Sequence, residues 1–219
     1  MPRIVALSDT HTLHDQVKLP EGDILVHAGD FTNAGEPKDI HRFHEWLYAQ
    51  PHPHKIVIAG NHDKLFEHNS HLARGILLAR DVHDRVRHKS IHYLEDEEAT
   101  VMGLRFWGSP WTPAFQGWAF NVERGQLWAK WRLIPDGIDV LITHGPPSGD
   151  LGGVLPEFKE EVGDPELLER IQQVHPKVHI CGHVHSGYGL RERFGIRFVN
   201  AAICDEAYEP CHPPVVIDL

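Results

Sequence analysis

The feature that most constrains this chain is a set of short apolar runs that each end in aspartate, histidine or asparagine. Continuous runs of Val, Ile, Leu and Ala are typical of strands that are buried on both faces of a sheet. In α/β sheets the carboxyl ends of parallel strands meet at one edge, and ligands bind there. We therefore expect an α/β fold that gathers these polar clusters at one edge. The runs cover residues 3–7, 23–28, 55–59, 138–142 and 178–181.

Segments with helical or alternating spacing separate these runs. Residues 37–49, 121–131 and 165–174 carry apolar side chains on one helical face, and Asp164 before Pro165 suits a helix N-cap. Tight turns such as Met102-Gly103 and Phe194-Gly195 join short strand candidates at 90–94, 99–102, 104–107, 189–193, 197–200 and 215–218. The pattern predicts two mixed sheets flanked by helices, in a single domain over residues 1–219.

Composition disfavours several classes of protein. The 21 Lys and Arg against 31 Asp and Glu give a formal net charge of −10, the wrong sign for a chain that binds by neutralising nucleic-acid phosphates. Three cysteines are a small and odd number for a disulfide scaffold. This count indicates a reduced, cytoplasmic compartment. We expect no membrane span, because no apolar stretch reaches the roughly 18 residues required. We expect no signal peptide, because no charged leader precedes the first run.

The polar clusters offer a mixed set of oxygen and nitrogen ligands. Carboxylates, an amide and imidazoles suit Mn²⁺, Fe²⁺ or Zn²⁺ better than Cu(I) or a thiolate zinc site. The candidates are too many for one ion but suit two ions that share a bridging carboxylate. Taken singly, each cluster also fits a turn, a helix N-cap or a chance pairing. Their joint occurrence after apolar runs favours a metal centre built from Asp9, His11, Asp30, Asn61, His144, His183 and His185.

The ordered blocks are Asp9-x-His11, Gly29-Asp30, Gly60-Asn61-His62-Asp63, Thr143-His144 and Gly182-His183-Val184-His185. They resemble the calcineurin-like metallophosphoesterase superfamily. With the flanking segments 8–11, 27–33, 55–62, 108–113, 134–139 and 143–147, the chain resembles more narrowly the metallophosphoesterase-domain-containing (MPPED) cyclic-nucleotide phosphodiesterase group. The resemblance implies a four-layer αββα sandwich with two divalent metals between the loops at the strand ends.

The resemblance also implies a role for each residue. One metal would be held by Asp9, His11 and His185, the other by Asn61, His144 and His183, with Asp30 bridging the two. A hydroxide between the metals would attack the phosphate. His62 would act as general acid toward the leaving oxygen, since an imidazole titrates near working pH. The alternative is that His62 only supports the turn.

Two departures from the family patterns bear on activity. Many phosphoprotein phosphatases of the superfamily read Gly-Asp-x-x-Asp-Arg, whereas this chain has Asn33 and Ala34 at the last two positions. Loss of the arginine weakens binding of a monoester dianion more than that of a diester monoanion. Some animal members of the narrower group have Gly where this chain has His183, so the complete set here predicts an active enzyme.

We therefore expect hydrolysis of small phosphodiesters, with 2′,3′- or 3′,5′-cyclic AMP as candidate substrates. A phosphomonoesterase or phosphoprotein phosphatase is the alternative, and a non-catalytic scaffold of the same fold is a further one. Nuclease action on long nucleic acids is disfavoured by the net acidity.

Aromatic residues concentrate in the Gly- and Pro-broken segment 106–120. Such side chains stack on nucleobases, which is worth about 1–3 kcal/mol per base; a hydrophobic cap beneath the loop is the alternative. The expected substrate-binding residues are Asn33, Asn61, His62, Trp107 and Trp111. The histidines outside the motifs are expected to lie mostly on the surface.

Overall fold

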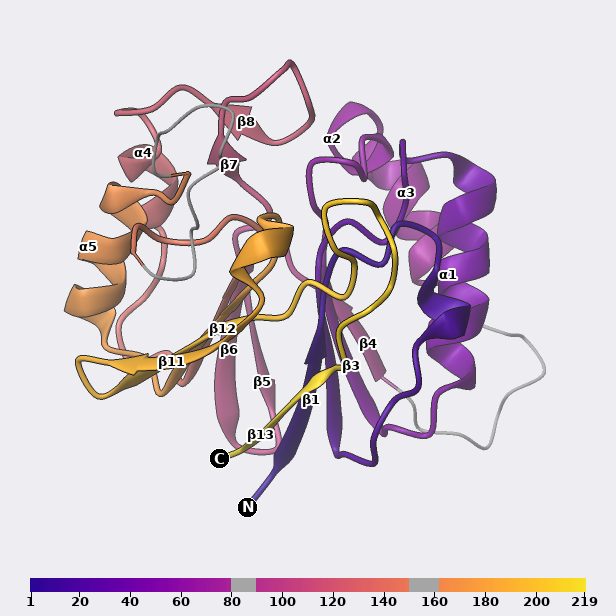
Figure 1. Ribbon diagram of the computed structural model, residues 1–219, viewed down its shortest axis with the longest axis horizontal. Helices are drawn as coiled ribbons and strands as arrows, with labels where there is room; N and C mark the ends of the chain where they lie inside the picture. The colour runs from indigo at the N-terminus through magenta and orange to yellow at the C-terminus, as the bar shows by residue number, and fades with distance from the viewer. Residues whose placement is uncertain (80–89, 150–161) are drawn as a thin grey trace.

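Two β-sheets lie face to face between two layers of helices (Figure 1). The computed structural model describes residues 1–79, 90–149 and 162–219. The first sheet has the order β13 (Val215–Asp218), β1 (Arg3–Leu7), β2 (Ile24–Ala28), β3 (His54–Ile58), β4 (Ser90–Tyr93). The second has the order β11 (Gly189–Arg193), β12 (Ile196–Asn200), β10 (Val178–Cys181), β9 (Val140–Thr143), β6 (Leu104–Ser109), β5 (Glu97–Val101).

Both sheets are mixed, as predicted. In the first, β1 to β4 run parallel and β13 pairs antiparallel with β1. In the second, β6, β9, β10 and β12 run parallel, with antiparallel β5 and β11 at the edges. A separate short pair joins β7 (Thr112–Pro113) to β8 (Asn121–Val122).

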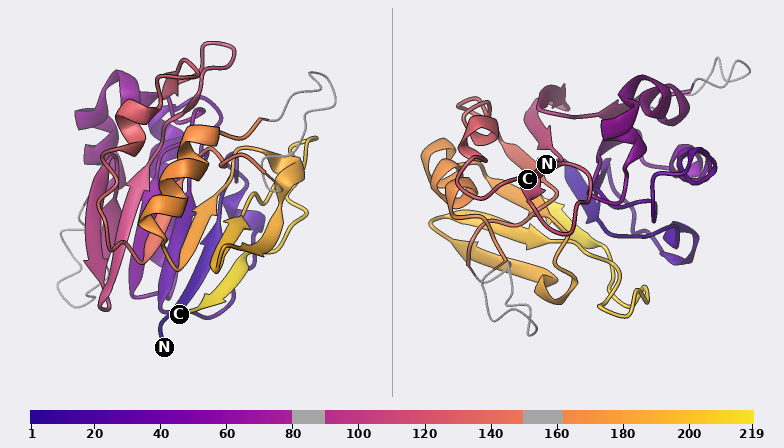
Figure 2. Two further views of the ribbon diagram at one scale, coloured as in Figure 1. Left: turned by 90° about the vertical axis from the view of Figure 1, so that its left-hand side faces the viewer. Right: turned by 90° about the horizontal axis from the view of Figure 1, so that it is seen from above.

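The alternation of side chains along each strand builds the layers. Ile4 and Val26 of the first sheet and Ile142 of the second enter one core between the sheets. The opposite face of the first sheet packs on α1 (Pro37–Ala49), α2 (Leu65–His68) and α3 (Ser70–Leu77). The opposite face of the second packs on α4 (Trp128–Trp131) and α5 (Pro165–Val174). The result is the expected four-layer αββα sandwich, which Figure 2 shows from two further directions.

Two of the predicted helices, α1 and α5, have the predicted bounds. The Asp164 side chain caps α5 by accepting a hydrogen bond from the amide of Glu166 at 2.9 Å. The helix predicted over 121–131 is wrong for its first half. Residues 121–122 form β8, and Gly125 at φ +81° breaks the helical path before α4. The pattern also did not reveal α2 and α3.

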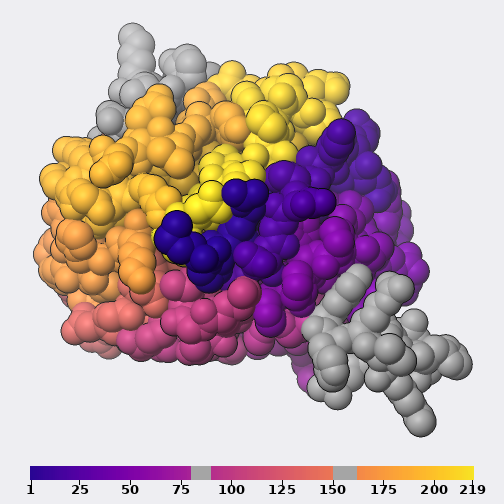
Figure 3. All heavy atoms as spheres, turned by 90° about the horizontal axis from the view of Figure 1, so that it is seen from below, coloured from indigo at the N-terminus to yellow at the C-terminus, as the bar shows by residue number. Residues whose placement is uncertain are grey.

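The two chain ends lie side by side on the face seen from below (Figure 3), opposite the carboxyl ends of the parallel strands. Arg3 and Asp218 form an ion pair of 2.8 Å there. Among the described residues no helix has the length and apolar character that crossing a membrane requires.

Candidate metal centre

The loops after five parallel strands meet at one end of the sandwich. The predicted ligands lie in these loops: Asp9 and His11 after β1, Asp30 after β2, Asn61 after β3, His144 after β9, and His183 and His185 after β10. Ligand atoms form three groups, in each of which they lie within 4.8 Å of one another: Asp9–His11–His185, His11–Asp30–His62 and Asp30–His144–His183. Shared His11 and Asp30 join the groups into one cluster that draws on both sheets.

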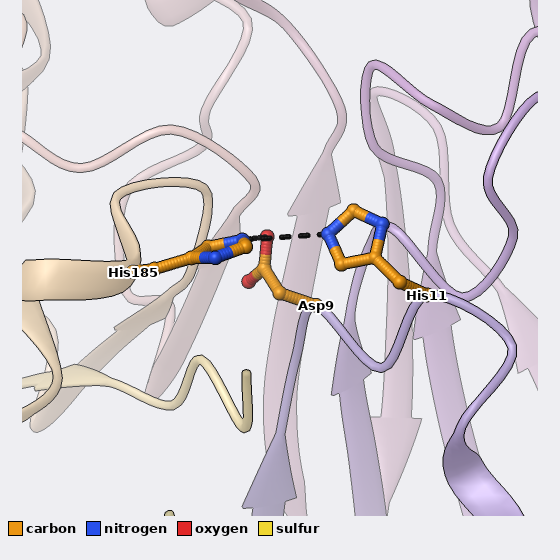
Figure 4. A group of neighbouring side chains, drawn as sticks. All are labelled: Asp9, His11 and His185. Atoms are coloured by element: carbon orange, nitrogen blue, oxygen red, sulfur yellow. Dashed lines mark hydrogen bonds and ion pairs between the residues drawn. The ribbon is translucent and has the colours of Figure 1, made fainter. Parts of the chain in front are cut away.

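The first group consists of Asp9, His11 and His185 (Figure 4). The Nε2 atoms of His11 and His185 are 3.3 Å apart, and Nε2 of His185 lies 3.5 Å from Oδ1 of Asp9. The other ring nitrogen of His11, Nδ1, is buried and has no hydrogen-bond partner among the described residues. Facing ring nitrogens at this distance are favourable only with a proton or a cation between them. The three side chains therefore present donor atoms to a common point.

The second group surrounds Asp30. Nε2 of His144 lies 3.2 Å from Oδ2 of Asp30 and 3.0 Å from Oδ1 of Asn61. The His183 ring lies 5.0 Å from the His144 ring, centroid to centroid. His144, Asp30 and Asn61 are only 0%, 2% and 4% exposed. The Asn61 amide adds an oxygen donor without adding negative charge.

Backbone carbonyl groups aim two of these rings. Nδ1 of His144 donates to the carbonyl of Ala28 at 2.8 Å, and Nδ1 of His185 donates to the carbonyl of Asp205 at 2.7 Å. Each bond leaves Nε2 directed into the cluster. Metal-binding histidines are commonly oriented by such a partner on the second nitrogen.

Two motif glycines permit the close approach of the loops. A Cβ at Gly60 would lie 2.2 Å from Oδ1 of Asp30, and a Cβ at Gly182 would lie 2.0 Å from Oδ2 of Asp9. The backbone amide of His183 donates to both carboxylate oxygens of Asp9, at 3.0 and 2.9 Å. The Gly182-His183 peptide thus fixes Asp9, and a larger residue at Gly182 would displace it.

The cluster keeps its carboxylates ionised. Burial raises the pKa of Asp9, but the hydrogen bond to His185 and the charge of His144 outweigh burial and hold this pKa below its ordinary value. Burial likewise raises the pKa of Asp30, and His144 outweighs it, so that pKa also lies below its ordinary value. Burial lowers the pKa of His144 and His185, but Asp30 and Asp9 respectively raise each to about 9. Burial lowers the pKa of His183 to about 4.

Asp63, a motif residue without a predicted role, holds the loops in place. Its buried carboxylate accepts hydrogen bonds from the amides of Gly60, Asp30 and Thr32, each at 2.9 Å, and from the hydroxyl of Thr32 at 2.7 Å. Burial and the nearby charge of Asp30 raise the pKa of Asp63 to about 7, although the hydrogen bonds lower it. Asp63 therefore links the loop after β2 to the loop after β3.

His62 lies at the solvent-facing side of the cluster. Its amide donates to Oδ1 of Asp30 at 2.8 Å, and its Nδ1 donates to the backbone carbonyl of Asn33 at 2.9 Å. The Asn33 side chain instead lies 3.4 Å from the hydroxyl of Thr12. Asn33 thus orients His62 through its carbonyl, which the side-chain identity at this position does not reveal.

The two predicted tryptophans are placed differently from expectation. Trp107 is 8% exposed and packs in the core between the second sheet and helices α4 and α5, away from the cluster. Trp111 donates from Nε1 to Asp96 at 2.9 Å, and Nζ of Lys130 lies 3.7 Å from its ring centroid. Within the described part of the chain neither ring stacks on a histidine of the cluster, and their role in substrate binding stays a prediction.

Two other aromatic residues do contact the cluster. Trp118 stacks on His62 with ring centroids 4.0 Å apart. Tyr208 lies 4.7 Å from His11 and 5.3 Å from His185, centroid to centroid. Trp118 lies in the aromatic segment that the sequence singled out, whereas no motif marks Tyr208.

Known proteins share both the sequence and the fold. A family model for calcineurin-like phosphoesterase matches residues 2–187. Human metallophosphoesterase domain-containing protein 1 is 44% identical over 231 aligned positions, covering 99% of this chain and 71% of that protein. UPF0046 protein C25E10.12 of Caenorhabditis elegans is 36% identical, covering 99% of this chain and 80% of its own length.

Among solved structures, TT1561 of Thermus thermophilus superposes with a TM-score of 0.58 at 15% identity, over 91% of this chain and 88% of that one. This likeness concerns the fold alone. The family match runs through the loops after all five strands and covers most of the sequence. The chain therefore belongs to the calcineurin-like phosphoesterase family and is a metal-dependent phosphoric ester hydrolase.

Proposed function

We propose that this enzyme hydrolyses small phosphodiesters, cyclic nucleotides such as 2′,3′- or 3′,5′-cyclic AMP among them, with two divalent metal ions. The observation that carries the proposal is the chain of three donor groups, Asp9–His11–His185, His11–Asp30–His62 and Asp30–His144–His183, which are joined through His11 and Asp30. A single ion needs fewer donors than this cluster provides. The cluster lies at the carboxyl edge of the sheets, where α/β proteins bind ligands.

The donors fit divalent ions of intermediate hardness. Two carboxylates, one amide oxygen and four imidazoles favour Mn²⁺, Fe²⁺ or Zn²⁺, and we expect Mn²⁺ first. The facing Nε2 atoms of His11 and His185, 3.3 Å apart, are the pattern that a cation between donors would satisfy. We assign Asp9, His11 and His185 to one ion, Asn61, His144 and His183 to the other, and Asp30 to both.

When bound, two divalent ions supply charge neutralisation for the phosphate and a water acidic enough to attack at neutral pH. The protein fixes the approach of the substrate. Asn61 and His62 are consecutive residues in the loop after β3, and we assign both to phosphate binding. Nδ1 of His62 donates to the Asn33 carbonyl, which leaves Nε2 to deliver a proton to the leaving oxygen.

The absence of an arginine at position 34 supports diesters over monoesters. Residue 34 is alanine and offers no bidentate contact to a dianionic phosphate. A diester has one negative charge fewer and loses less from this change. A phosphomonoesterase or phosphoprotein phosphatase acting at the same site is the second candidate function.

The test is a substrate panel on metal-free protein reloaded separately with Mn²⁺, Fe²⁺ or Zn²⁺. We expect turnover of cyclic AMP to exceed that of the matching 5′-monophosphate, and Asp30→Asn and His183→Ala to abolish it. Matched control substitutions at Asp218, which lies at the far end of β13, should leave turnover unchanged. Faster cleavage of the monoester would favour the second candidate, and undiminished turnover in Asp30→Asn would contradict the metal mechanism.

We further propose that residues 1–219 act as one domain, because strands of both sheets share one core. The reduced, cytoplasmic location that the three cysteines indicate remains a prediction; all three are free thiols in the structure.

A further inference from the structure

We propose that Trp118 is a positioning residue for His62, holding its ring at the angle that proton delivery requires. The inference rests on the proposed function, in which His62 protonates the leaving oxygen. The two rings stack with centroids 4.0 Å apart and an interplanar angle of 28°. Nζ of Lys64 lies 4.1 Å from the centroid of the Trp118 ring, so the three side chains form a stack.

A hydrogen bond alone does not fix the plane of the His62 ring. The bond from Nδ1 to the carbonyl of Asn33, 2.9 Å long, sets the direction of one ring nitrogen. The ring can still turn about that line, which would swing Nε2 away from the cluster. The flat contact with Trp118 on one face and the edge contact with His11, at 4.8 Å and 84°, restrict this rotation. The ring is thereby held in two independent directions.

Trp118 can serve this purpose because its own loop is fixed. The amide of the next residue, Ala119, donates to the carbonyl of Asn61 at 3.3 Å, which ties the loop to the turn that carries His62. Ala119 and Phe120 are 2% and 1% exposed. The Asn121 side chain accepts from the amide of Phe115 at 3.0 Å and donates to the carbonyl of Ala119 at 3.0 Å. Trp118 is therefore presented by an anchored loop.

This role predicts a defect that depends on the leaving group. A cyclic nucleotide expels an alkoxide and needs a proton from His62, whereas bis(4-nitrophenyl) phosphate expels a stable phenolate and does not. General acid catalysis typically contributes about 10²–10⁴-fold, and misplacement of about 1 Å can cost 10²-fold. We expect Trp118→Leu to lower kcat on cyclic AMP about 10- to 100-fold, with KM changed less than about threefold. On the nitrophenyl diester its kcat should fall less than about threefold.

The experiment compares the wild-type enzyme with Trp118→Leu, Trp118→Phe, His62→Gln and the double variant Trp118→Leu/His62→Gln. Trp118→Phe keeps a flat face and should restore most of kcat on cyclic AMP. His62→Gln should show the same leaving-group bias. The double variant should be no slower than His62→Gln, because the two substitutions remove the same function. Lys64→Met, which keeps the aliphatic stem, provides a milder second perturbation with the same bias. Metal content and Tm should stay at wild-type values in all four single variants.

Several results would overturn the inference. Equal losses on both diesters would make Trp118 a general structural support, and a raised KM with unchanged kcat would make it a substrate contact. A leaving-group bias in His62→Gln without one in Trp118→Leu would refute the positioning role alone. A wild-type enzyme that cleaves neither diester, or a His62→Gln variant without the bias, would instead refute the proposed function or its acid, and the inference with it.

Discussion

Replacing His14 by phenylalanine should remove about 2 kcal/mol from the loss of stability that this fold suffers between pH 8 and pH 5. The His14 ring is fully buried, and neither of its nitrogens has a hydrogen-bond partner within residues 1–79, 90–149 and 162–219. Phe43 and Trp46 lie 5.4 and 5.1 Å away, centroid to centroid. Burial lowers the pKa of His14 to about 4, against a small opposing effect of Asp15. The unfolded chain binds a proton at His14 near pH 6.5, and the folded chain does not until about pH 4.

The sign and size of the effect follow from this difference. Well above pH 6.5, as at pH 8, neither state is protonated at His14, and His14 does not affect stability. As the pH falls below 6.5, the unfolded state gains protons first and is stabilised relative to the folded state. A shift from about 6.5 to about 4 destabilises the fold by about 2 kcal/mol between pH 8 and pH 5, and by about 3 kcal/mol in strong acid.

The measurement is urea unfolding of metal-free protein at pH 8 and pH 5. We expect the free energy of unfolding of the wild type to fall by about 2 kcal/mol more than that of His14→Phe between pH 8 and pH 5. Fitting the larger phenylalanine ring has the same cost at pH 8 and at pH 5. This cost therefore cancels when the free energies of unfolding at the two pH values are subtracted. His71→Phe, at an exposed position of α3, is the matched control and should keep the wild-type pH dependence. Parallel curves for His14→Phe and wild type would refute the reasoning.

Three further changes test the site and the fold. Gly182→Ala should displace Asp9, since the new Cβ would lie 2.0 Å from its Oδ2, and metal analysis should then find fewer than two ions per chain. Gly75→Ala, whose new Cβ would have no described atom within 4 Å, should retain both ions. His62→Gln should keep both ions by the same analysis while kcat falls, whereas loss of an ion would make His62 a ligand with His11 and Asp30. Asp164→Ala should lower the free energy of unfolding by about 2–4 kcal/mol, because it removes the cap of α5 and leaves the buried Trp131 Nε1, now 2.7 Å away, without an acceptor. Asp136→Ala, which removes an exposed carboxylate from its pair with the mostly buried Arg170, should cost less than about 1 kcal/mol in the same unfolding assay, and a cost equal to that of Asp164→Ala would contradict this account.

The ligand cluster was predictable because each candidate follows directly on a buried parallel strand. Asp9 lies two residues after β1, Asp30 two after β2, and His144 one after β9. Parallel strands bring their carboxyl ends to one edge, so residues far apart in sequence converge there. The hydrophobic runs alone set this geometry, and no knowledge of the loops was needed to bring the clusters together.

The aromatic contacts were not predictable in the same way. Trp107 and Phe106 are neighbours on β6, and the strand sends them to opposite faces: Phe106 enters the core between the sheets and Trp107 the core beneath α4 and α5. The composition of segment 106–120 does not show which aromatic side chain faces the core between the sheets and which faces the helices. Trp118 reaches His62 only because Gln116 and Gly117 both turn through positive φ, at 51° and 68°. The sequence singled out segment 106–120, but the residue of this segment that stacks on His62 is Trp118, which the prediction did not name.

The histidines outside the motifs show a second limit of prediction from sequence. They were expected mostly on the surface, yet His14, His27, His52 and His179 are buried. Histidine is intermediate in burial preference, so its identity alone does not place it. His27 and His179 lie within buried strands, where hydrogen bonds to Thr10 at 3.0 Å and Thr143 at 2.8 Å satisfy one nitrogen each. Reading each strand as continuous, rather than each histidine by itself, would have predicted these two.

Backbone conformation marks the site in a way that sequence cannot. Asp9, His11, Asp30 and His183 have φ values of 53°, 42°, 56° and 67°, a left-handed region that costs a non-glycine residue roughly 1–2 kcal/mol. Met102, which also has a positive φ, lies instead in an exposed turn. Around the cluster the cost is offset by buried hydrogen bonds, such as those that the carboxylate of Asp9 accepts from the amide of His183. Tyr208, with φ +61° and its ring 4.7 Å from His11, shares this conformation. Strained backbone and contact with the cluster thus single out a residue that no spacing or motif identifies.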